Sequence, residues 1–189
     1  VMDTDMSDDA FPPYCLRDAH IGHAPVFAQR LSFTGETGWE IFVTPDFAEH
    51  VLDTVLAAGE PLGLRLAGGE ALDALRIEKG FLHWGADMAY TEAPYQLGLD
   101  FICKPGKTLP FIGQDACLAR KADPKGPCLR SVRLADPDAI LHHNEPVLRD
   151  GQIIGFVTSG AFCAMQKAAV GLCLVSPPDG AGGLSLIHI

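Results

Sequence analysis

The hydrophobic periodicity of this chain changes near Pro94, and this change limits the folds that the chain can adopt. Before it, segments with strand-like alternation are followed by segments with a helical period. After residue 126, nearly every apolar segment is short and rich in β-branched residues, as in strands. Strands mixed with helices, followed by strands alone, predict an α+β fold. The expected strands are residues 23–33 and 39–43, and the expected helices are residues 46–58, 69–79 and 114–121.

The ends of the first two helices are marked by residues that commonly start and stop helices. Thr44 and Pro45 precede the first one, since Thr is favoured at the N-cap and Pro at the first helical position. Gly59 and Gly80 follow the last apolar residues, where glycine often terminates a helix. A short helical turn capped by Ser7 is also expected at residues 7–10.

The second half contains a strong hairpin signal. Asp150-Gly151 separates two strand-like segments, and this dipeptide suits a two-residue β-turn. Several short strands with glycine turns predict a small barrel or sandwich. The expected strands are residues 128–134, 146–149, 152–158 and 168–175.

These patterns predict how the chain is divided. We expect an α+β part at residues 1–102, a Pro/Gly-rich junction with a short helix at 103–125, and a small β-domain at 126–183. The last six residues, LSLIHI at 184–189, resemble a translated sequencing adapter and are expected not to be native. The β-domain is therefore predicted to lack its closing strand and to be incomplete.

The composition limits the kinds of partner that the chain is expected to bind. A net charge of −10 disfavours nonspecific binding to nucleic acid or anionic membranes, because both need clustered Lys and Arg. No apolar run is long enough for a membrane helix, and the acidic N-terminus has no signal-peptide character. The six cysteines form no CxxC pair, and the adjacent His142 and His143 would point apart, so no metal site is predicted. Free thiols in a reducing compartment are expected.

Two carboxylates interrupt the apolar segment LSFTGETGWEIF at residues 31–42. On a period of two, Trp39, Ile41 and Val43 share one face of a strand, and Glu40 lies on the other face with Phe42. Glu40 can therefore line a cavity or be a solvated charge on an edge strand, and the pattern alone leaves both open. Glu36 lies in the turn, where hydrogen bonding to loop amides is the favoured role.

Four strings occur in order at natural distances: SFTGETGWEIFV (32–43), ALDALRIEKGFLHWGADM (71–88), FIGQDA (111–116) and DGQIIGFVTSG (150–160). From about Met6 to Asp179 the chain resembles the aminomethyltransferase, or glycine cleavage T protein, superfamily. Within that superfamily, it is most similar to the folate-binding C-terminal region of dimethylglycine and sarcosine dehydrogenases. The resemblance implies a fragment truncated at both ends: part of a ferredoxin-like folate-binding domain, then a small barrel.

The resemblance also implies a reaction. A flavin domain with FAD oxidises an N-methyl amine, and the folate module transfers the one-carbon unit to tetrahydrofolate, giving 5,10-methylenetetrahydrofolate. The family's catalytic aspartate would lie upstream of Val1, and no GxGxxG motif occurs here. No catalytic residue is therefore predicted in this chain, which alone is expected to be inactive. The parent is expected to be a soluble enzyme of the bacterial cytoplasm or the mitochondrial matrix.

Site residues carried over from the family are Glu40, Phe33, Glu36 and Trp84. Glu40 matches the glutamate that accepts hydrogen bonds from the pterin, in the manner of a bidentate charge-assisted pair. Phe33 takes a position usually held by tyrosine, so it keeps the ring and loses the hydroxyl. Trp84 is also a candidate, although packing in the core is its favoured role.

Several positions differ from the pattern of the family, and they help to distinguish the branches of the superfamily. Leu72 stands where T proteins carry an arginine and the amine dehydrogenases an apolar residue, and Gln96 replaces a common glutamate. Arg76 is expected to brace the structure, and Thr158-Ser159-Gly160 is expected to form a turn at the barrel mouth. A stand-alone aminomethyltransferase stays open as an alternative, as does a sulfonium demethylase. A non-catalytic, regulatory folate protein is disfavoured, because such relatives carry a cysteine in the string that here reads EKGFLHWGADM.

Overall fold

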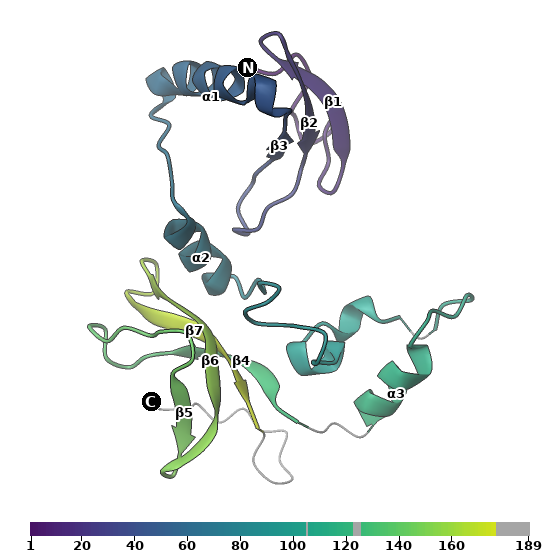
Figure 1. The fold of residues 1–189 in the computed structure, drawn as a ribbon, viewed down its shortest axis with the longest axis vertical. Helices are drawn as coiled ribbons and strands as arrows, with labels where there is room; N and C mark the ends of the chain where they lie inside the picture. The colour runs from purple at the N-terminus through teal and green to yellow at the C-terminus, as the bar shows by residue number, and fades with distance from the viewer. Residues whose placement is uncertain (105, 123–125, 177–189) are drawn as a thin grey trace. The chain divides into compact units, whose positions relative to one another are not determined.

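The structure is a computed structural model that describes residues 1–104, 106–122 and 126–176. The chain forms two compact units, Val1–Leu72 and Asp73–Ile189 (Figure 1). Each unit contains an antiparallel sheet and a helix, which confirms the α+β fold class. The predicted boundaries at residues 102, 125 and 183 are not tested by this division and stay predictions.

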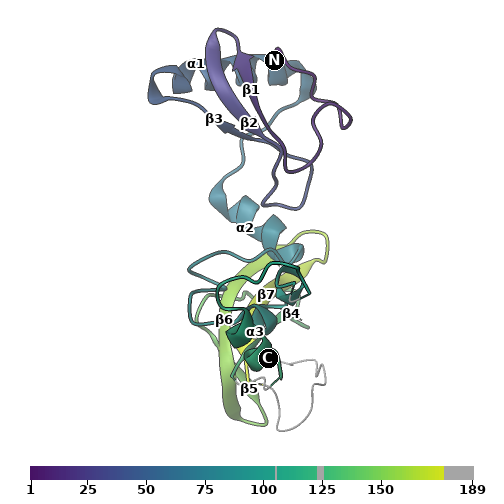
Figure 2. The same cartoon turned by 90° about the vertical axis from the view of Figure 1, so that its right-hand side faces the viewer.

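The first unit is a three-stranded antiparallel sheet with a helix packed on one face (Figure 2). The helix α1 contributes Val51, with Phe47 and Val55, to a core built with inward residues of the sheet such as Ile21 and Val26. The strands in spatial order are β1 (Leu16–Ile21), β2 (Ala24–Gln29) and β3 (Glu40–Phe42), and α1 spans Pro45–Gly59.

Strand β1 was not predicted, and its composition explains why. Its sequence LRDAHI carries polar or charged side chains at three of six positions, and only Ala19 and Ile21 are buried. Its pairing with β2 supplies the stability that its own residues do not indicate. Strand β2 is shorter than expected because the chain leaves the sheet after Gln29 to form the loop before β3.

Helix α1 starts and ends where the sequence predicted. Thr44 is the N-cap residue and Pro45 the first helical residue, although the Thr44 side chain makes no capping hydrogen bond. Residues 7–10 form a turn, and the hydroxyl of Ser7 accepts a hydrogen bond from the Ala10 N–H at 3.4 Å. The expected helical turn with Ser7 as its cap is therefore present without developing into a helix.

The second unit is built around a four-stranded antiparallel sheet with the spatial order β4-β7-β6-β5. Helix α2 begins in the first unit and ends in the second, and the short helices η2 and η3 precede α3. The bounds are α2 Gly69–Glu78, η2 Pro94–Leu97, η3 Asp100–Ile102, α3 Gln114–Ala122, β4 Cys128–Arg133, β5 Pro146–Arg149, β6 Gln152–Cys163 and β7 Ala168–Val175.

Two core clusters pack around this sheet. One is centred on Leu141, Val147 and Val157, and the other brings Ile77 of α2 against Val170 and Leu172 of β7. Strand β7 is buried along almost its whole length, which explains its nearly continuous apolar sequence AAVGLCLV. The sheet is therefore covered on both sides by parts of its own unit.

The hairpin prediction is confirmed, and the extent of its second strand is corrected. Asp150 and Gly151 have φ of 51° and 75°, as a type I′ turn requires, and join β5 to β6. Strand β6 continues to Cys163, so residues 158–160 lie inside a strand and form no turn. The register between β6 and β7 shifts between Val157 and Ser159, which marks a bulge at Thr158.

Close backbone packing explains a glycine next to this bulge. A Cβ atom on Gly160 would lie 2.4 Å from the carbonyl oxygen of Leu141, closer than any real contact. The TSG string therefore needs glycine for space in the strand, where the sequence had suggested a turn. The expected non-native tail at residues 184–189 lies outside the described residues.

Candidate functional site

Strand β3 places the Glu40 carboxylate on the side of the sheet away from the core. Ile41 and Val43 pack against the core of the first unit, while Glu40 and Phe42 are exposed. The alternation predicted for this strand is confirmed. Within the described ranges, no donor contacts the Glu40 carboxylate, so it is available to an external donor.

A buried arginine fixes the residue before Glu40. Arg30 is 9% exposed, and its guanidinium donates to the Phe11 carbonyl at 2.6 Å and to the Asp8 carboxylate at 2.5 Å. Its Cζ also lies 5.3 Å from the centre of the Trp39 ring, in cation–π geometry. Because Arg30 holds Trp39 and the core holds Ile41, the backbone of Glu40 is constrained from both sides.

The loop between β2 and β3 carries the two other predicted residues of this unit. Phe33 is half-buried and Glu36 is exposed. The Glu36 N–H donates to the Thr34 hydroxyl at 3.4 Å, and that hydroxyl lies 3.2 Å from the Ser32 hydroxyl. Side chains of the loop therefore hydrogen-bond within it, as its Thr/Gly composition suggested. Phe33, Glu36 and Glu40 all belong to the first unit.

Trp84 belongs to the second unit and is 64% exposed. Its backbone forms an isolated bridge with Met88, in a loop that turns through Gly85. The role favoured for Trp84, packing in the core, is therefore wrong for the second unit by itself. A large exposed indole is available for contact with a ligand or another surface.

The second unit contains a buried ion pair that the sequence did not reveal. Arg76 of α2 is 2% exposed and Asp87 is fully buried, and the guanidinium Nη1 donates to the Asp87 carboxylate at 2.5 Å. Nη2 donates to the Ser159 hydroxyl and Nε to Asp73, both at 2.8 Å. The expected bracing role of Arg76 is confirmed, because it ties α2 to strand β6.

Asp87 is equally well supplied with donors. Its carboxylate accepts the His83 N–H at 2.9 Å and the Thr158 hydroxyl at 2.5 Å, besides Arg76. A buried ion pair stabilises a fold only when its remaining polar atoms are satisfied. This pair meets that condition, so it is a structural network and offers no open position to a ligand.

Gln96 has a role that the glutamate common in the family could not fill. Its side chain is buried, its Oε1 accepts the Ala93 N–H at 2.8 Å, and its Nε2 donates to the Pro127 carbonyl at 2.8 Å. A carboxylate cannot donate to a carbonyl. The amide thus joins helix η2 to the start of β4.

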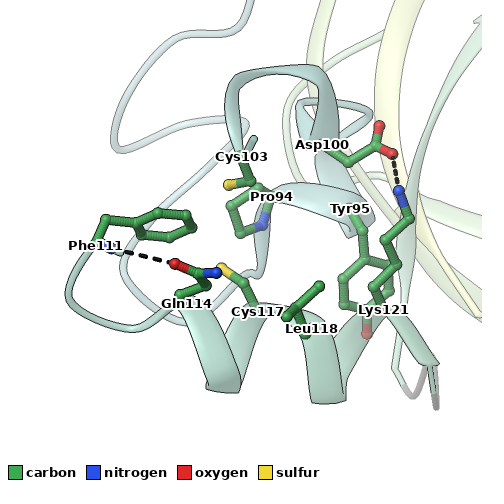
Figure 3. Close-up of a pocket in the computed structure, with 9 residues that line it drawn as sticks. All are labelled: Pro94, Tyr95, Asp100, Cys103, Phe111, Gln114, Cys117, Leu118 and Lys121. Carbon is green, nitrogen blue, oxygen red and sulfur yellow. Dashed lines mark hydrogen bonds and ion pairs between the residues drawn. The ribbon is translucent and has the colours of Figure 1, made fainter. Parts of the chain in front are cut away.

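A small pocket lies between η2, η3 and α3 (Figure 3). Its free volume is about 30 Å³, room for about one or two water molecules. It is far too small for a pterin ring. It is lined by Pro94, Tyr95, Asp100, Cys103, Phe111, Gln114, Cys117, Leu118 and Lys121.

The remaining titratable groups do not form a metal centre in the part of the chain that the structure describes, since no three His, Cys, Asp or Glu side chains converge there. No described helix is long and apolar enough to cross a membrane. All six cysteines are free thiols.

Comparisons with known proteins identify the class of this chain. The GCVT N-terminal domain matches residues 1–107, and the glycine cleavage T-protein C-terminal barrel domain matches residues 128–186. The first match alone covers more than half of the chain, so the chain belongs to the glycine cleavage T-protein family, whose members bind tetrahydrofolate. The resemblance inferred from the four sequence strings is confirmed.

Individual relatives agree with this assignment. The chain is 41% identical over 175 residues to 4-methylaminobutanoate oxidase (formaldehyde-forming) of Paenarthrobacter nicotinovorans, covering 92% of this chain and 21% of the relative. It is 37% identical over 190 residues to mitochondrial sarcosine dehydrogenase of Homo sapiens, covering 98% of this chain and 20% of that protein. The chain therefore spans about a fifth of the length of these curated relatives.

The fold has a solved counterpart. The crystal structure of the glycine cleavage system aminomethyltransferase T from Bartonella henselae matches with a TM-score of 0.70 and 25% identity. The match covers 79% of this chain and 41% of that one.

Sequence reasoning missed Arg30 and Asp87. Asp87 stands in the loop string GADM, two residues after Gly85, where an acidic residue is usually solvated. The available signal was Arg76, a charged residue in the apolar period of a helix, which implies a buried partner.

Proposed function

We propose that this chain is the tetrahydrofolate-binding, one-carbon transfer module of a flavin-dependent N-methylglycine-type dehydrogenase that forms 5,10-methylenetetrahydrofolate. The observation that carries the proposal is the Glu40 carboxylate, which is exposed and contacts no donor among the described residues. Its strand is held by the core on one side and by Arg30 through Trp39 on the other. Such a carboxylate is pre-organised for an external ligand.

The chemistry of Glu40 suits a pterin. A pterin presents a ring N–H and an adjacent amino group in a row, and one carboxylate can accept both in a charge-assisted pair. Phe33 would contribute an aromatic wall, and Glu36 would hold the loop in shape. The family resemblance also predicts a folate contact for Trp84, whose indole is exposed. When bound, tetrahydrofolate supplies the nitrogen atoms that accept the one-carbon unit.

The dehydrogenase assignment rests on Leu72 and on the relatives. Leu72 is apolar and 39% exposed where T proteins carry an arginine, so this chain lacks that cation. Sarcosine dehydrogenase and the methylaminobutanoate oxidase support a parent that acts on N-methyl amines. In such a parent, FAD and the amine belong to a separate flavin domain, and the catalytic aspartate precedes Val1. We place the parent among soluble enzymes of the bacterial cytoplasm or mitochondrial matrix.

A stand-alone aminomethyltransferase is the second candidate. The aminomethyltransferase of Clostridium botulinum (strain Okra / Type B1) is 34% identical over 159 residues, and the chain covers 43% of its length. This similarity supports an aminomethyltransferase parent, whereas Leu72 opposes it.

The test uses the parent enzyme with Glu40→Ala, beside Glu36→Ala as a comparison from the loop that precedes strand β3. Losing a bidentate charge-assisted pair is expected to cost about 2–4 kcal/mol. That loss weakens tetrahydrofolate binding by about 30- to 800-fold. Amine oxidation with an artificial electron acceptor should stay nearly unchanged in both variants. An equal loss of tetrahydrofolate binding and of amine oxidation in Glu40→Ala would mean that Glu40 is structural, and it would overturn the assignment.

A further inference from the structure

Two of the six cysteines share one small pocket. Cys103 follows η3, Cys117 lies in the first turns of α3, and both line the pocket between them (Figure 3). Burial, together with the neighbouring Cys117 thiol, raises the pKa of the Cys103 thiol. Both residues are half-buried, so small reagents can reach the pair.

The elements that carry the two thiols are held together by a separate contact. Lys121 of α3 donates to the Asp100 carboxylate of η3 at 2.8 Å. The Lys121 ammonium also lowers the pKa of Asp100 through that hydrogen bond, which keeps the carboxylate charged. Cys103 and Cys117 each stand three or four residues from one end of this bridge. The bridge therefore links the two segments that carry the thiols without a covalent bond.

The other cysteines have no such arrangement. Cys163 and Cys173 are buried in β6 and β7, and the strand registers place neither opposite a cysteine. Cys173 instead lies 3.5 Å from the Arg130 carbonyl, and Cys163 accepts the Gln166 N–H at 3.3 Å. Cys15 belongs to the first unit. These thiols provide internal controls of different exposure.

We propose that Cys103 and Cys117 form a reversible intramolecular disulfide, a redox modification site that links η3 to α3. The oxidant is a hydroperoxide such as hydrogen peroxide. One thiolate attacks the O–O bond, giving a sulfenic acid and water, and the second thiol attacks that sulfur, forming the S–S bond and releasing a second water. Two thiols thus lose two electrons and two protons to one peroxide.

Either thiol can be the one that peroxide oxidises, since attack by the second thiol on the resulting sulfenic acid gives the same disulfide. The product would close the loop between the two residues and join the wall of the pocket to α3.

The experiment treats the reduced full chain with hydrogen peroxide, blocks the remaining thiols under denaturing conditions and digests with trypsin. Lys104 precedes a proline, so the peptide with Cys103 runs from Gly80 to Lys107, and the peptide with Cys117 from Thr108 to Arg120. The expected result is a linked pair of these peptides, at a rate independent of protein concentration. Reduction with a dithiol should separate them.

Variants test the pairing. Cys103→Ser and Cys117→Ser should each abolish the link and leave the remaining thiol as a sulfenic acid that dimedone traps. Cys128→Ser, a half-buried cysteine of β4, should leave the link unchanged. The proposal is overturned if both thiols stay reduced while Cys15 oxidises. It is equally overturned if Cys117 over-oxidises, or links to another chain, without linking to Cys103.

Discussion

The two units use carboxylates in opposite ways. In the second unit, Asp87 is fully buried and accepts hydrogen bonds from Arg76, His83 and Thr158. In the first unit, Glu40 is exposed on a strand that is rigidly held, and it contacts no donor within the described residues. A saturated carboxylate stabilises its unit, whereas an unpaired one on a fixed strand is available to a ligand. The contrast separates structural acids from candidate binding residues.

The largest expected effect comes from breaking the saturated network. Asp87→Ala leaves the Arg76 guanidinium buried without its partner, which is expected to cost about 3–5 kcal/mol of unfolding free energy. Chemical denaturation of the second unit measures this loss. Asp73→Ala removes the partly exposed contact to the same guanidinium and should cost less than about 1 kcal/mol. Similar costs for the two variants would contradict the central role of Asp87.

A buried thiol gives the second unit a pH dependence at the alkaline end. Burial raises the pKa of Cys173 to about 11 from an ordinary value of 9.0. The pKa of Cys173 is higher in the folded than in the unfolded protein, so the buried neutral thiol contributes to the stability of the fold. This contribution is complete below pH 9 and is lost as the pH rises toward 11.

The expected loss is on the order of 2 kcal/mol. Denaturation at a series of pH values measures it, with Cys173→Ala as the comparison. The variant should be less stable at neutral pH and should show a shallower alkaline decline. An unchanged decline would assign the effect to other groups.

Gln96 tests whether buried polar groups of this unit tolerate a change of charge. Gln96→Glu replaces a donor by an acceptor against the Pro127 carbonyl, and leaving these groups unsatisfied should cost about 1–3 kcal/mol at neutral pH. The cost should shrink at low pH, where the protonated carboxyl can donate again. Thermal denaturation at pH 7 and pH 4 distinguishes this result from a cost that is independent of pH.

The smallest effect on stability is expected at Glu40. Glu40→Gln changes an exposed side chain with no described partner and should alter the unfolding free energy by less than about 0.5 kcal/mol. A cost comparable to that of Asp87→Ala would mean that Glu40 holds the fold, and the contrast between the units would fail.

Much of the fold was predictable because local signals agreed with tertiary contacts. The ends of α1, the Asp150-Gly151 turn and the apolar β7 each follow from local chemistry. Strand β1 was not predictable, since its outward residues are polar and its partner stabilises it. The TSG string was misread because three small residues suit a turn, and only packing against Leu141 shows why a strand needs Gly160.

The candidate site was predictable only in part. Period-two alternation placed Glu40 opposite the core residues Ile41 and Val43, and the structure agrees. Its ligand came from the resemblance to a family, since one carboxylate does not specify a pterin. The Arg76–Asp87 pair was not predictable, because the two residues are eleven positions apart in sequence and joined only by the fold.

The most direct test of the contrast is the melting temperature of the parent protein with and without saturating tetrahydrofolate, for the wild type and for Glu40→Gln. A ligand that binds only the folded state stabilises it by RT ln(1 + [L]/Kd), so the shift in melting temperature grows with the logarithm of the affinity. We predict equal melting temperatures without ligand and a shift with tetrahydrofolate that Glu40→Gln largely removes. A variant that melts earlier without ligand and keeps the full shift would contradict the account, because Glu40 would then stabilise the fold and would not bind folate.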